Sequence, residues 1–349
     1  MISKHSPTDI SRSEGCTLTG VLSVTGFLED AVTVIHGPSG CAHHNASLLH
    51  ASLAEIDAAD LPVLISSSLS EEEVIFGGEG ALAHALDIAA SLDPDLICVI
   101  STCIADTIGD DCAALCRQKR EMPVVYIPGA GFLGGGFSEG IRNALMSLLP
   151  LSSGADQTDD AGVMIVGEKN LEYEAEENFY EVIRLLSLLD LNPGIRFVRR
   201  MPASDCTYLG SAPVAILREP ALHQVGSAIQ DRFGTSIIQG FPIGPSESLD
   251  FIRSIGNLYG IDPVPAVREE EGVLDDLFAS FCDLRGLTVR IEPAGANPAS
   301  LEAAQAILQA LGMKESASGM PLPLPFDPPV GTGGTKRMLH AWRRQISRA

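Results

Sequence analysis

The stretch from Val34 to Asn45, VIHGPSGCAHHN, decides how the rest of the chain is interpreted. A β-branched run from Ala31 to Ile35 ends in the turn sequence Gly37-Pro38-Ser39-Gly40, and Cys41 follows at once. A short apolar run bounded by glycine and proline is typical of a buried strand that ends in a turn. The sequence therefore predicts a cysteine on a glycine-rich turn at the end of a buried strand.

Similar short runs recur farther along the chain and predict further strands, at Val63–Ser66, Leu96–Ile100, Val124–Ile127 and Val163–Val166. Because these runs alternate with helical patterns, they predict an α/β fold of Rossmann-like, doubly wound parallel sheets in two or three units. Such sheets bind ligands beyond the carboxyl ends of their strands. Cys41, Cys103 and a glycine-rich loop at 129–136 all fall at predicted strand ends. The loop could cover a substrate or simply allow tight packing.

The length of 349 residues exceeds what one hydrophobic core usually spans. An acidic, polar stretch at Ser152–Ala161 is typical of a linker. We therefore expect an N-terminal α/β domain with the cysteines at 1–151 and a second α/β domain at 152–265. A truncated third unit with a C-terminal helix is expected at 266–349.

The charge balance of 23 Lys+Arg against 45 Asp+Glu gives a net charge of −22. Such a surface repels nucleic acid and anionic lipid, so neither is an expected partner. The acidity fits a partner that docks through basic residues, and it equally fits a salt-rich cytosol. The sequence shows no signal peptide and no apolar run long enough for a membrane span, so a cytoplasmic protein is expected.

The chain contains eight cysteines, at positions 16, 41, 98, 103, 112, 116, 206 and 282. In a large intracellular chain, cysteines are more often thiols or metal ligands than disulfides. Cys16, Cys41 and Cys103 lie next to glycine-containing turns, where the backbone can approach an iron–sulfur cluster and donate N–H groups to its sulfurs. From the cysteines alone, burial in the core is the favoured explanation, and it is their positions at glycine-flanked turns that argue for a cluster.

Three of the other cysteines, Cys98, Cys112 and Cys116, are expected to be packing residues. Cys98 lies inside a predicted strand, and Cys112 and Cys116 share one face of a predicted helix. That pair could bind a metal ion, but core packing is the favoured interpretation. Cys206 and Cys282 have no potential ligands beside them in the sequence.

Several motifs resemble the nitrogenase component 1 family, in the same order along the chain. They are Cys16-Thr17-Leu18-Thr19-Gly20, His36-Gly37-Pro38-Ser39-Gly40-Cys41, Glu73-x-x-Phe76-Gly77-Gly78-Glu79, Ser101-Thr102-Cys103-x₅-Gly109-Asp110-Asp111, Gly131-Phe132, Gly167-Glu168-x-Asn170 and Phe241-Pro242-Ile243-Gly244-Pro245. The family includes nitrogenase subunits, cofactor-assembly scaffolds, the dark-operative protochlorophyllide reductases and the Ni-sirohydrochlorin a,c-diamide reductive cyclase.

The resemblance implies that Cys16, Cys41 and Cys103 are the three ligands that one subunit gives to a [4Fe–4S] cluster at a subunit interface. It also implies a like subunit as partner, in a homo- or heterodimer, and a separate ATP-hydrolysing iron protein that supplies electrons. The expected function is a catalytic subunit of a nitrogenase-like reductase that acts on a small molecule such as a tetrapyrrole. The alternatives are a metal-cluster assembly scaffold without turnover and a degenerate homologue that binds a partner without a cluster.

Two departures from the family argue against dinitrogen reduction. The position that aligns with the further cofactor cysteine of nitrogenase falls near Arg218, and Cys206 lies too early to replace it. After Leu311 too few residues remain for a full third α/β unit with its cofactor histidine. The resemblance therefore implies electron relay without the nitrogen-fixing cofactor.

The remaining polar motifs have structural explanations. His36 is expected to be a hydrogen-bonded structural group, and His43 and His44 either face solvent or donate to a ligand. Glu73 is expected to cap a helix with Ser70. The stretch Gly331–Lys336 lacks the spacing of a phosphate-binding loop and is predicted to be a turn before a basic helix, so any ATP hydrolysis belongs to a partner.

Overall fold

The computed structural model describes residues 15–55, 61–132, 135–154, 162–292, 298–325 and 327–348. They divide into two compact units. The cysteine unit comprises the described parts of Ile10–Tyr173 and Gly194–Gln239, and the helical unit those of Glu174–Pro193 and Gly240–Ala349. The domain boundaries expected from the sequence, at 151 and 265, stay a prediction.

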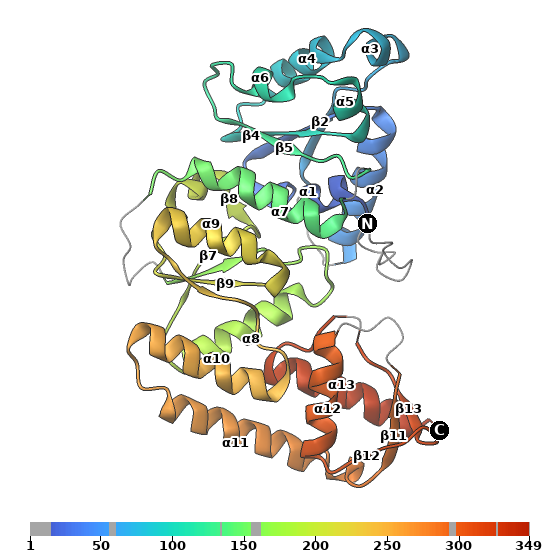
Figure 1. Ribbon diagram of the computed structural model, residues 1–349, viewed down its shortest axis with the longest axis vertical. Coiled ribbons are helices and arrows are strands. Elements are labelled where there is room, and N and C mark those ends of the chain that lie inside the picture. The colour runs from blue at the N-terminus through green and yellow to red at the C-terminus, as the bar shows by residue number, and fades with distance from the viewer. Residues whose placement is uncertain are drawn as a thin grey trace, which may run out of the picture. The chain divides into compact units, whose positions relative to one another are not determined.

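The first sheet of the cysteine unit has four parallel strands in the order β3-β2-β4-β5 (Figure 1). The strands are β2 (Ala31–His36), β3 (Val63–Ser66), β4 (Leu96–Ser101) and β5 (Val124–Pro128). The connecting helices are α2 (Ser39–Glu55), α3 (Glu71–Phe76), α4 (Glu79–Ala90), α5 (Cys103–Ile108) and α6 (Cys112–Cys116). His36 pairs with Ser101 in register, so the carboxyl ends of the two central strands lie side by side.

A second sheet in the same unit has the order β10-β9-β6-β7. Its strands are β6 (Val163–Val166), β7 (Pro193–Phe197), β9 (Val214–Leu217) and β10 (Ser236–Ile238), and α9 (His223–Phe233) connects β9 to β10. A short parallel pair, β1 (Leu28–Glu29) and β8 (Met201–Pro202), accompanies the two sheets. Ile35 and Ile100 of the first sheet share one hydrophobic core with Met164 and Ala215 of the second. The predicted α/β class with doubly wound parallel sheets is confirmed.

Helices α1 (Thr17–Thr25) and α7 (Phe137–Leu148) cross at two glycines. A Cβ added to Gly20 would lie 2.0 Å from the carbonyl oxygen of Phe137, and one added to Gly140 would lie 2.1 Å from that of Thr17. Because these contacts are to backbone atoms, any larger residue would force the helices apart. The crossing therefore fixes the start of α1, directly after Cys16.

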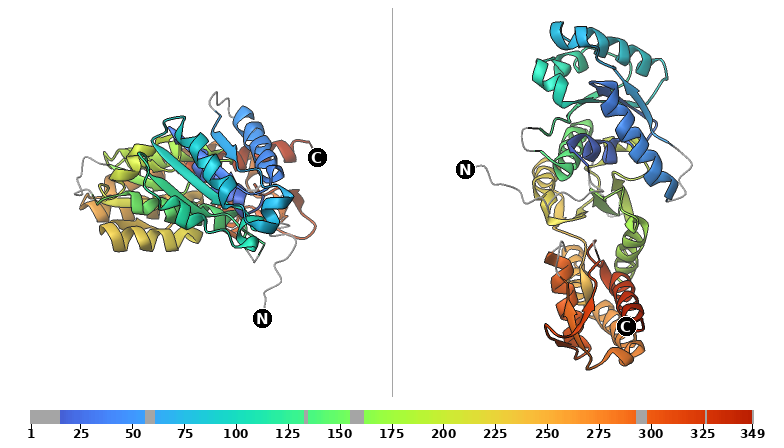
Figure 2. Two further views of the ribbon diagram at one scale, coloured as in Figure 1. Left: turned by 90° about the horizontal axis from the view of Figure 1, so that it is seen from above. Right: turned by 90° about the vertical axis from the view of Figure 1, so that its right-hand side faces the viewer.

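The helical unit combines five helices with a small parallel sheet in the order β12-β11-β13. The helices are α8 (Ala175–Ser187), α10 (Gly244–Tyr259), α11 (Val264–Ser280), α12 (Pro298–Ala310) and α13 (Gly331–Ile346). The strands are β11 (Thr288–Ile291), β12 (Lys314–Glu315) and β13 (Met320–Leu322). Fully buried Trp342 of α13 packs in this core, and the right-hand view of Figure 2 shows the orange and red elements as one group.

Helices α10 and α13 begin in the same way. Pro242-Ile243-Gly244 and Pro329-Val330-Gly331 run antiparallel, with Gly244 N–H donating to the Pro329 carbonyl (2.8 Å) and Gly331 N–H to that of Pro242 (2.9 Å). A hydroxyl one turn later donates to each glycine carbonyl, from Ser248 at 2.8 Å and from Thr335 at 2.9 Å. The two segments are therefore a local structural repeat.

The prediction of a turn over Gly331–Lys336 is wrong, because α13 already begins at Gly331. Two carboxylates from other helices satisfy its first turn. Glu181 of α8 accepts the N–H of Gly333 at 3.0 Å, and buried Glu270 of α11 accepts the hydroxyl of Thr332. Unpaired N–H groups at a helix N-terminus favour negative charge, so these contacts stabilise a helix start that is glycine-rich.

Among the described residues, no helix combines the length and the apolar character needed to cross a membrane.

Candidate functional site

The three cysteines singled out in the sequence all lie where a helix begins. Cys16 is the residue before α1, Cys41 lies in the first turn of α2, and Cys103 is the first residue of α5. Cys16 is exposed, whereas Cys41 and Cys103 are partly buried.

The structure brings these three thiols together. Burial raises the pKa of Cys41, and the charges of Cys16 and Cys103 raise it further. Like charges that share one place disfavour ionisation unless a positive charge compensates them. A bound metal centre would supply such a charge.

The surroundings of the thiols fit an iron–sulfur group. Thr17, next to Cys16, and Thr102, next to Cys103, each have a buried hydroxyl oxygen without a hydrogen-bond partner. Such hydroxyls are potential donors to the sulfur of a cluster. In the described part of the chain, no three His, Cys, Asp or Glu side chains are arranged around a single metal ion.

The glycine-rich loop that follows β5 packs against this site. A Cβ on Gly131 would lie 2.3 Å from the Thr17 hydroxyl oxygen, and one on Gly135 would lie 2.7 Å from it. Of the two explanations left open by the sequence, tight packing therefore applies to these glycines. Residues 133 and 134 of the loop lie outside the described residues.

The histidines and the glutamate near Cys41 have the structural roles that the sequence predicts for them. His36 is fully buried and bonds Ser67 and Asp110 through its two ring nitrogens. His43 and His44 are exposed. Glu73 accepts the N–H and the hydroxyl of Ser70, which lower the pKa of Glu73, so the predicted capping role is confirmed.

Four further cysteines are buried; for Cys98, Cys112 and Cys116 this is the packing role expected from the sequence. Cys98 and Cys206 are fully buried. Burial raises the pKa of Cys112 to about 12, that of Cys116 to about 11 and that of Cys206 to about 12. Thiols that remain protonated in the core are poor metal ligands. Cys282 is exposed, on the helical unit.

The carboxyl edge of the second sheet carries charges that sequence reasoning did not connect. Arg218, after β9, bonds Glu172 at 3.0 Å, and Lys169, after β6, lies 3.5 Å from Glu172 and 3.2 Å from Glu219. Arg218 is 4% exposed. Burial alone would lower the pKa of Lys169, but the carboxylates of Glu219 and Glu172 outweigh it and raise that pKa. The position near Arg218, where the resemblance to nitrogenase would place a cofactor cysteine, is therefore part of an ion network at the carboxyl edge of the second sheet.

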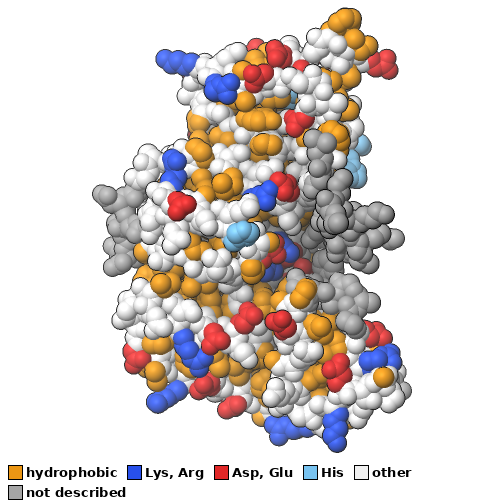
Figure 3. All heavy atoms as spheres, viewed as in Figure 1, with side chains coloured by type: hydrophobic (Ala, Val, Ile, Leu, Met, Phe, Trp, Pro, Cys, Tyr) orange, Lys and Arg blue, Asp and Glu red, His pale blue; other side chains and the backbone are white. Residues whose placement is uncertain are grey.

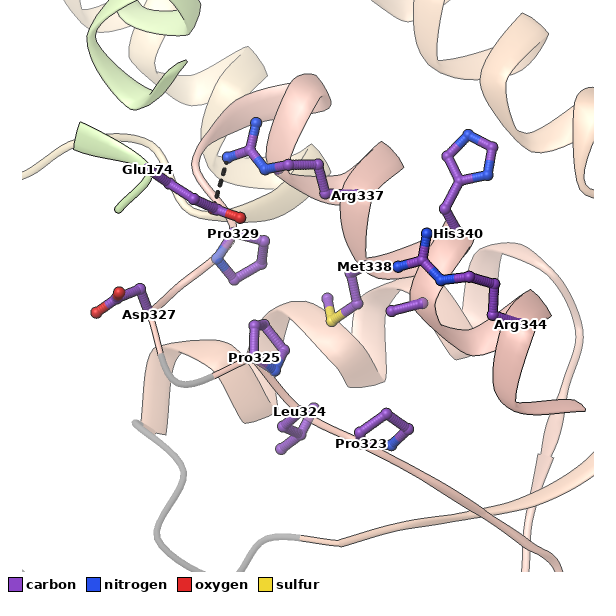
Figure 4. Close-up of a pocket in the computed structure, with 12 residues that line it drawn as sticks. Glu174, Pro323, Leu324, Pro325, Asp327, Pro329, Arg337, Met338, His340 and Arg344 are labelled. Carbon is purple, nitrogen blue, oxygen red and sulfur yellow. Dashed lines mark ion pairs between the residues drawn. The ribbon is translucent and has the colours of Figure 1, made fainter. Parts of the chain in front are cut away.

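Two cavities lie away from the thiols. One of about 450 Å³ in the helical unit lies between α13 and a proline-rich segment, and its walls include Pro323, Pro325 and Met338 (Figure 4). Arg337 crosses its upper side and pairs with Glu174 at 2.9 Å. The other cavity, of about 750 Å³, lies at the amino-terminal edge of the first sheet, lined by residues 26–32. It is therefore at the opposite edge of that sheet from Cys41 and Cys103.

Comparison with known proteins places this geometry in a family. The family model described as Nitrogenase component 1 type Oxidoreductase matches residues 16–323. The chain is 24% identical over 324 residues to the nitrogenase molybdenum-iron protein alpha chain of Methanococcus maripaludis, covering 86% of this chain and 66% of that protein. It is 35% identical over 163 residues to the nitrogenase iron-molybdenum cofactor biosynthesis protein NifE of Clostridium pasteurianum, covering 45% and 35% of the two chains.

The fold agrees with these similarities. The solved structure titled "Nitrogenase Cp1 at pH 5" matches with a TM-score of 0.68 at 18% identity, over 91% of this chain and 68% of the other. The chain spans less than two thirds of the length of the two curated relatives, 66% and 35%. Since the family model covers most of the chain, including all three grouped cysteines, the chain belongs to the nitrogenase component 1 type oxidoreductase family.

Proposed function

We propose that this chain is a redox subunit in which Cys16, Cys41 and Cys103 hold a [4Fe–4S] cluster, completed by a ligand from a like subunit. The observation that supports the proposal is that Cys16 and Cys103, each at a helix start, lie close enough to Cys41 for their charges to influence it. When bound, such a cluster accepts and donates single electrons. The chain's own part is to hold three thiolates at helix starts and to surround them with packed threonine and glycine residues.

An exposed apolar tip supports docking of a separate electron donor. Ile75 and Phe76, at the end of α3, are 73% and 82% exposed, and Figure 3 shows apolar side chains protruding over this helix. Helix α3 packs on α5, which begins at Cys103. Exposed aromatic residues are preferred anchors of protein interfaces. We propose that an ATP-hydrolysing iron protein binds there, with a basic face that complements the net charge of −22.

The substrate in this proposal is a small unsaturated molecule, such as a tetrapyrrole. The ion network around Arg218 leaves no thiol at the edge where a second metal centre would need one. The proposed reaction is therefore reduction of an organic molecule by electrons that pass the three thiolates, without a further metallocofactor in this chain.

A second candidate function is a scaffold on which a metal cluster is assembled and then handed on. The observation that favours it is the similarity to proteins named for iron-molybdenum cofactor biosynthesis. In a scaffold the cluster is cargo and leaves the protein, whereas in the redox subunit it stays. Whether the cluster stays on the protein or leaves it can therefore be measured to distinguish the two functions.

The test is anaerobic purification of the full chain, with iron and sulfide analysis and EPR after reduction by dithionite. The proposal expects iron and sulfide in the wild type and their loss in Cys41→Ala, while Cys282→Ser retains both. Cys282 is the matched control, because it is exposed and lies on the other unit. A wild type without iron, or an unchanged signal in Cys41→Ala, would contradict it.

Adding an iron protein and MgATP then distinguishes the candidates. Repeated reoxidation of the reduced cluster by a candidate tetrapyrrole, with the iron content unchanged, supports the redox subunit. Transfer of iron to an added apoprotein, without turnover, supports the scaffold.

A further inference from the structure

A buried chain of hydrogen bonds runs behind the cysteines and is centred on His36, the last residue of β2. The imidazole is fully buried, and both of its nitrogens are paired. Nδ1 lies 2.9 Å from the Ser67 hydroxyl, and Nε2 lies 2.8 Å from a carboxylate oxygen of Asp110, whose side chain is 3% exposed.

Which atom donates in each of these bonds follows from the other hydrogen bonds that Ser67 and Asp110 make. The N–H of Gly37 donates to the Ser67 oxygen at 3.1 Å, so the Ser67 hydroxyl is free to donate to Nδ1 of a neutral imidazole. Nε2–H then donates to Asp110, whose two oxygens also accept the N–H of Gly78 at 3.0 and 3.1 Å. This tautomer, assigned from the network, leaves every member of the chain paired.

The chain connects three backbone segments that the proposed function uses. Gly37 opens the turn that leads to Cys41. The carbonyl of His36 accepts the N–H of Thr102, directly before Cys103, at 3.0 Å. Gly78 follows the loop after Phe76, at the end of the apolar tip. His36 therefore lies between two of the cysteines and the tip.

The loop at Gly78 rests directly on this pair of side chains. A Cβ on Gly78 would lie 2.7 Å from the Asp110 oxygen and 3.2 Å from Cε1 of His36. The Asp110 carboxylate is therefore held between the imidazole and the loop, with no space for a shifted position. Removing one partner of a buried hydrogen-bonded charge leaves the other unsatisfied, so loss of either group disturbs the whole chain.

We infer that His36 is a positioning residue that, through Asp110 and Ser67, sets the placement of Cys41, Cys103 and the apolar tip together. A change at the His36–Asp110 pair is then felt both at the thiols and at the tip. The relevance of this coupling to electron transfer rests on the proposed function. The coupling itself is a property of the protein chain and can be measured without a cluster.

The test uses the full chain in its metal-free form and compares Asp110→Asn with Asp111→Asn. The control makes the same chemical change one position away, on a side chain that caps α6 and has no contact with His36 in the described bonds. Two readouts are followed by mass spectrometry: hydrogen exchange over residues 71–79, and alkylation rates of Cys41 and Cys103. For Asp110→Asn we expect both to rise about tenfold, and for Asp111→Asn neither to change.

The variant Ser67→Ala separates the two halves of this hydrogen-bond network. It removes the link between His36 and the Cys41 turn but leaves Asp110 on Gly78. Alkylation of Cys41 should therefore rise while exchange at the tip stays as in the wild type. Circular dichroism and thermal melting of each variant show whether it is folded, and a folded Asp110→Asn with thiols and tip both unchanged overturns the inference. A response confined to residues 109–111 also overturns it.

The cluster-loaded protein distinguishes failure of the inference from failure of the proposed function. If the metal-free experiment succeeds and no cluster binds, the coupling stands and the proposed function fails. If a cluster binds but metal-free, folded Asp110→Asn leaves the thiols and the tip both unchanged, the cluster of the proposed function stands and the inference fails.

Discussion

The carboxyl edges of the two parallel sheets occupy the same place in the fold and carry opposite chemistry. The edge of the first sheet presents thiols at helix starts, two of them partly buried and one exposed. The edge of the second sheet presents Arg218, Lys169, Glu172 and Glu219, whose charges pair with each other. The edge of the first sheet has groups of one kind, the thiols. The edge of the second sheet has opposite charges that pair with each other.

The difference shows how one fold can carry grouped thiols at the edge of one sheet and a self-paired ion network at the edge of another. Ligands bind at such edges because strand ends leave polar groups and space there. At the second edge an internal salt-bridge network takes over those groups, and replacing its members should cost stability. At the first edge the thiols make few bonds, so replacing them should cost binding and little stability.

The largest expected effect concerns thiol reactivity. In the metal-free protein, native-state alkylation should modify Cys16, Cys41, Cys103 and Cys282 and leave the four buried cysteines intact. Burial protects those four sterically and raises their pKa values, to about 12 for Cys112 and Cys206, which keeps them protonated. Mass spectrometry of digests checks this. Modification of Cys112 as fast as Cys282 would contradict the assignment.

The same experiment on the cluster-loaded protein sharpens the comparison. Bound thiolates cannot react, so Cys16, Cys41 and Cys103 should become protected while Cys282 stays reactive. Equal protection of Cys282 would show that the loss of reactivity has another cause.

Arg218→Met should destabilise the cysteine unit by about 3 kcal/mol, because it leaves the Glu172 carboxylate buried with only the more distant Lys169, at 3.5 Å, to pair with it. The matched control is Arg253→Met, whose pair with Asp250 is exposed at both ends and should contribute less than about 1 kcal/mol. Urea unfolding measures both free energies of unfolding. A loss of less than about 1 kcal/mol for Arg218→Met would remove the contrast between the two edges.

Phe76→Ala should slow reduction by the iron protein about tenfold, because an exposed aromatic anchor at an interface is commonly worth more than 1 kcal/mol. Reduction by dithionite needs no docking and should not change. Tyr208→Ala provides the control, since Tyr208 is also an exposed aromatic residue of the cysteine unit, at 56%. Equal slowing by both variants would exclude a specific role of the tip.

The smallest expected effect is a pH dependence at the second edge. Because the folded-state pKa of Lys169 lies above its ordinary value of 10.5, Lys169 contributes stability that is fully present below pH 10.5. This contribution is lost as the pH rises through the raised pKa. Lys169→Met should therefore flatten the fall in unfolding free energy above pH 10.5, whereas replacing exposed Lys119 should not. Thermal melting across this range measures the difference.

Regular apolar runs made much of the fold predictable. The strands at Val63–Ser66 and Val163–Val166 have the predicted bounds. The β1–β8 pair was missed, because two-residue strands far apart in the sequence leave no periodic pattern.

Only those parts of the candidate site that lie at the ends of strands could be predicted from the sequence pattern. The strand ends predicted that Cys41 and Cys103 lie at one edge, whereas Cys16 was grouped with them only through the family resemblance. The role of all three as cluster ligands stays a prediction. The bond between His36 and Asp110 was not predictable, because the two residues lie 74 positions apart and neither shows its partner in sequence. The Arg218 network was missed for the same reason, since charged residues after strands look alike whether paired or free.

The contacts at the start of α13 have a consequence for the order in which the chain matures on the ribosome. Glu181 emerges 152 residues before the Gly333 amide that it bonds, and Thr332 follows Glu270 by 62. The cysteine unit ends its contribution at Gln239, so its segments are all synthesised before that amide exists. Units that fold as wholes can assemble in sequence during synthesis. A nascent chain paused before Gly331 would therefore expose a finished cysteine unit beside a helical unit still lacking its last helix.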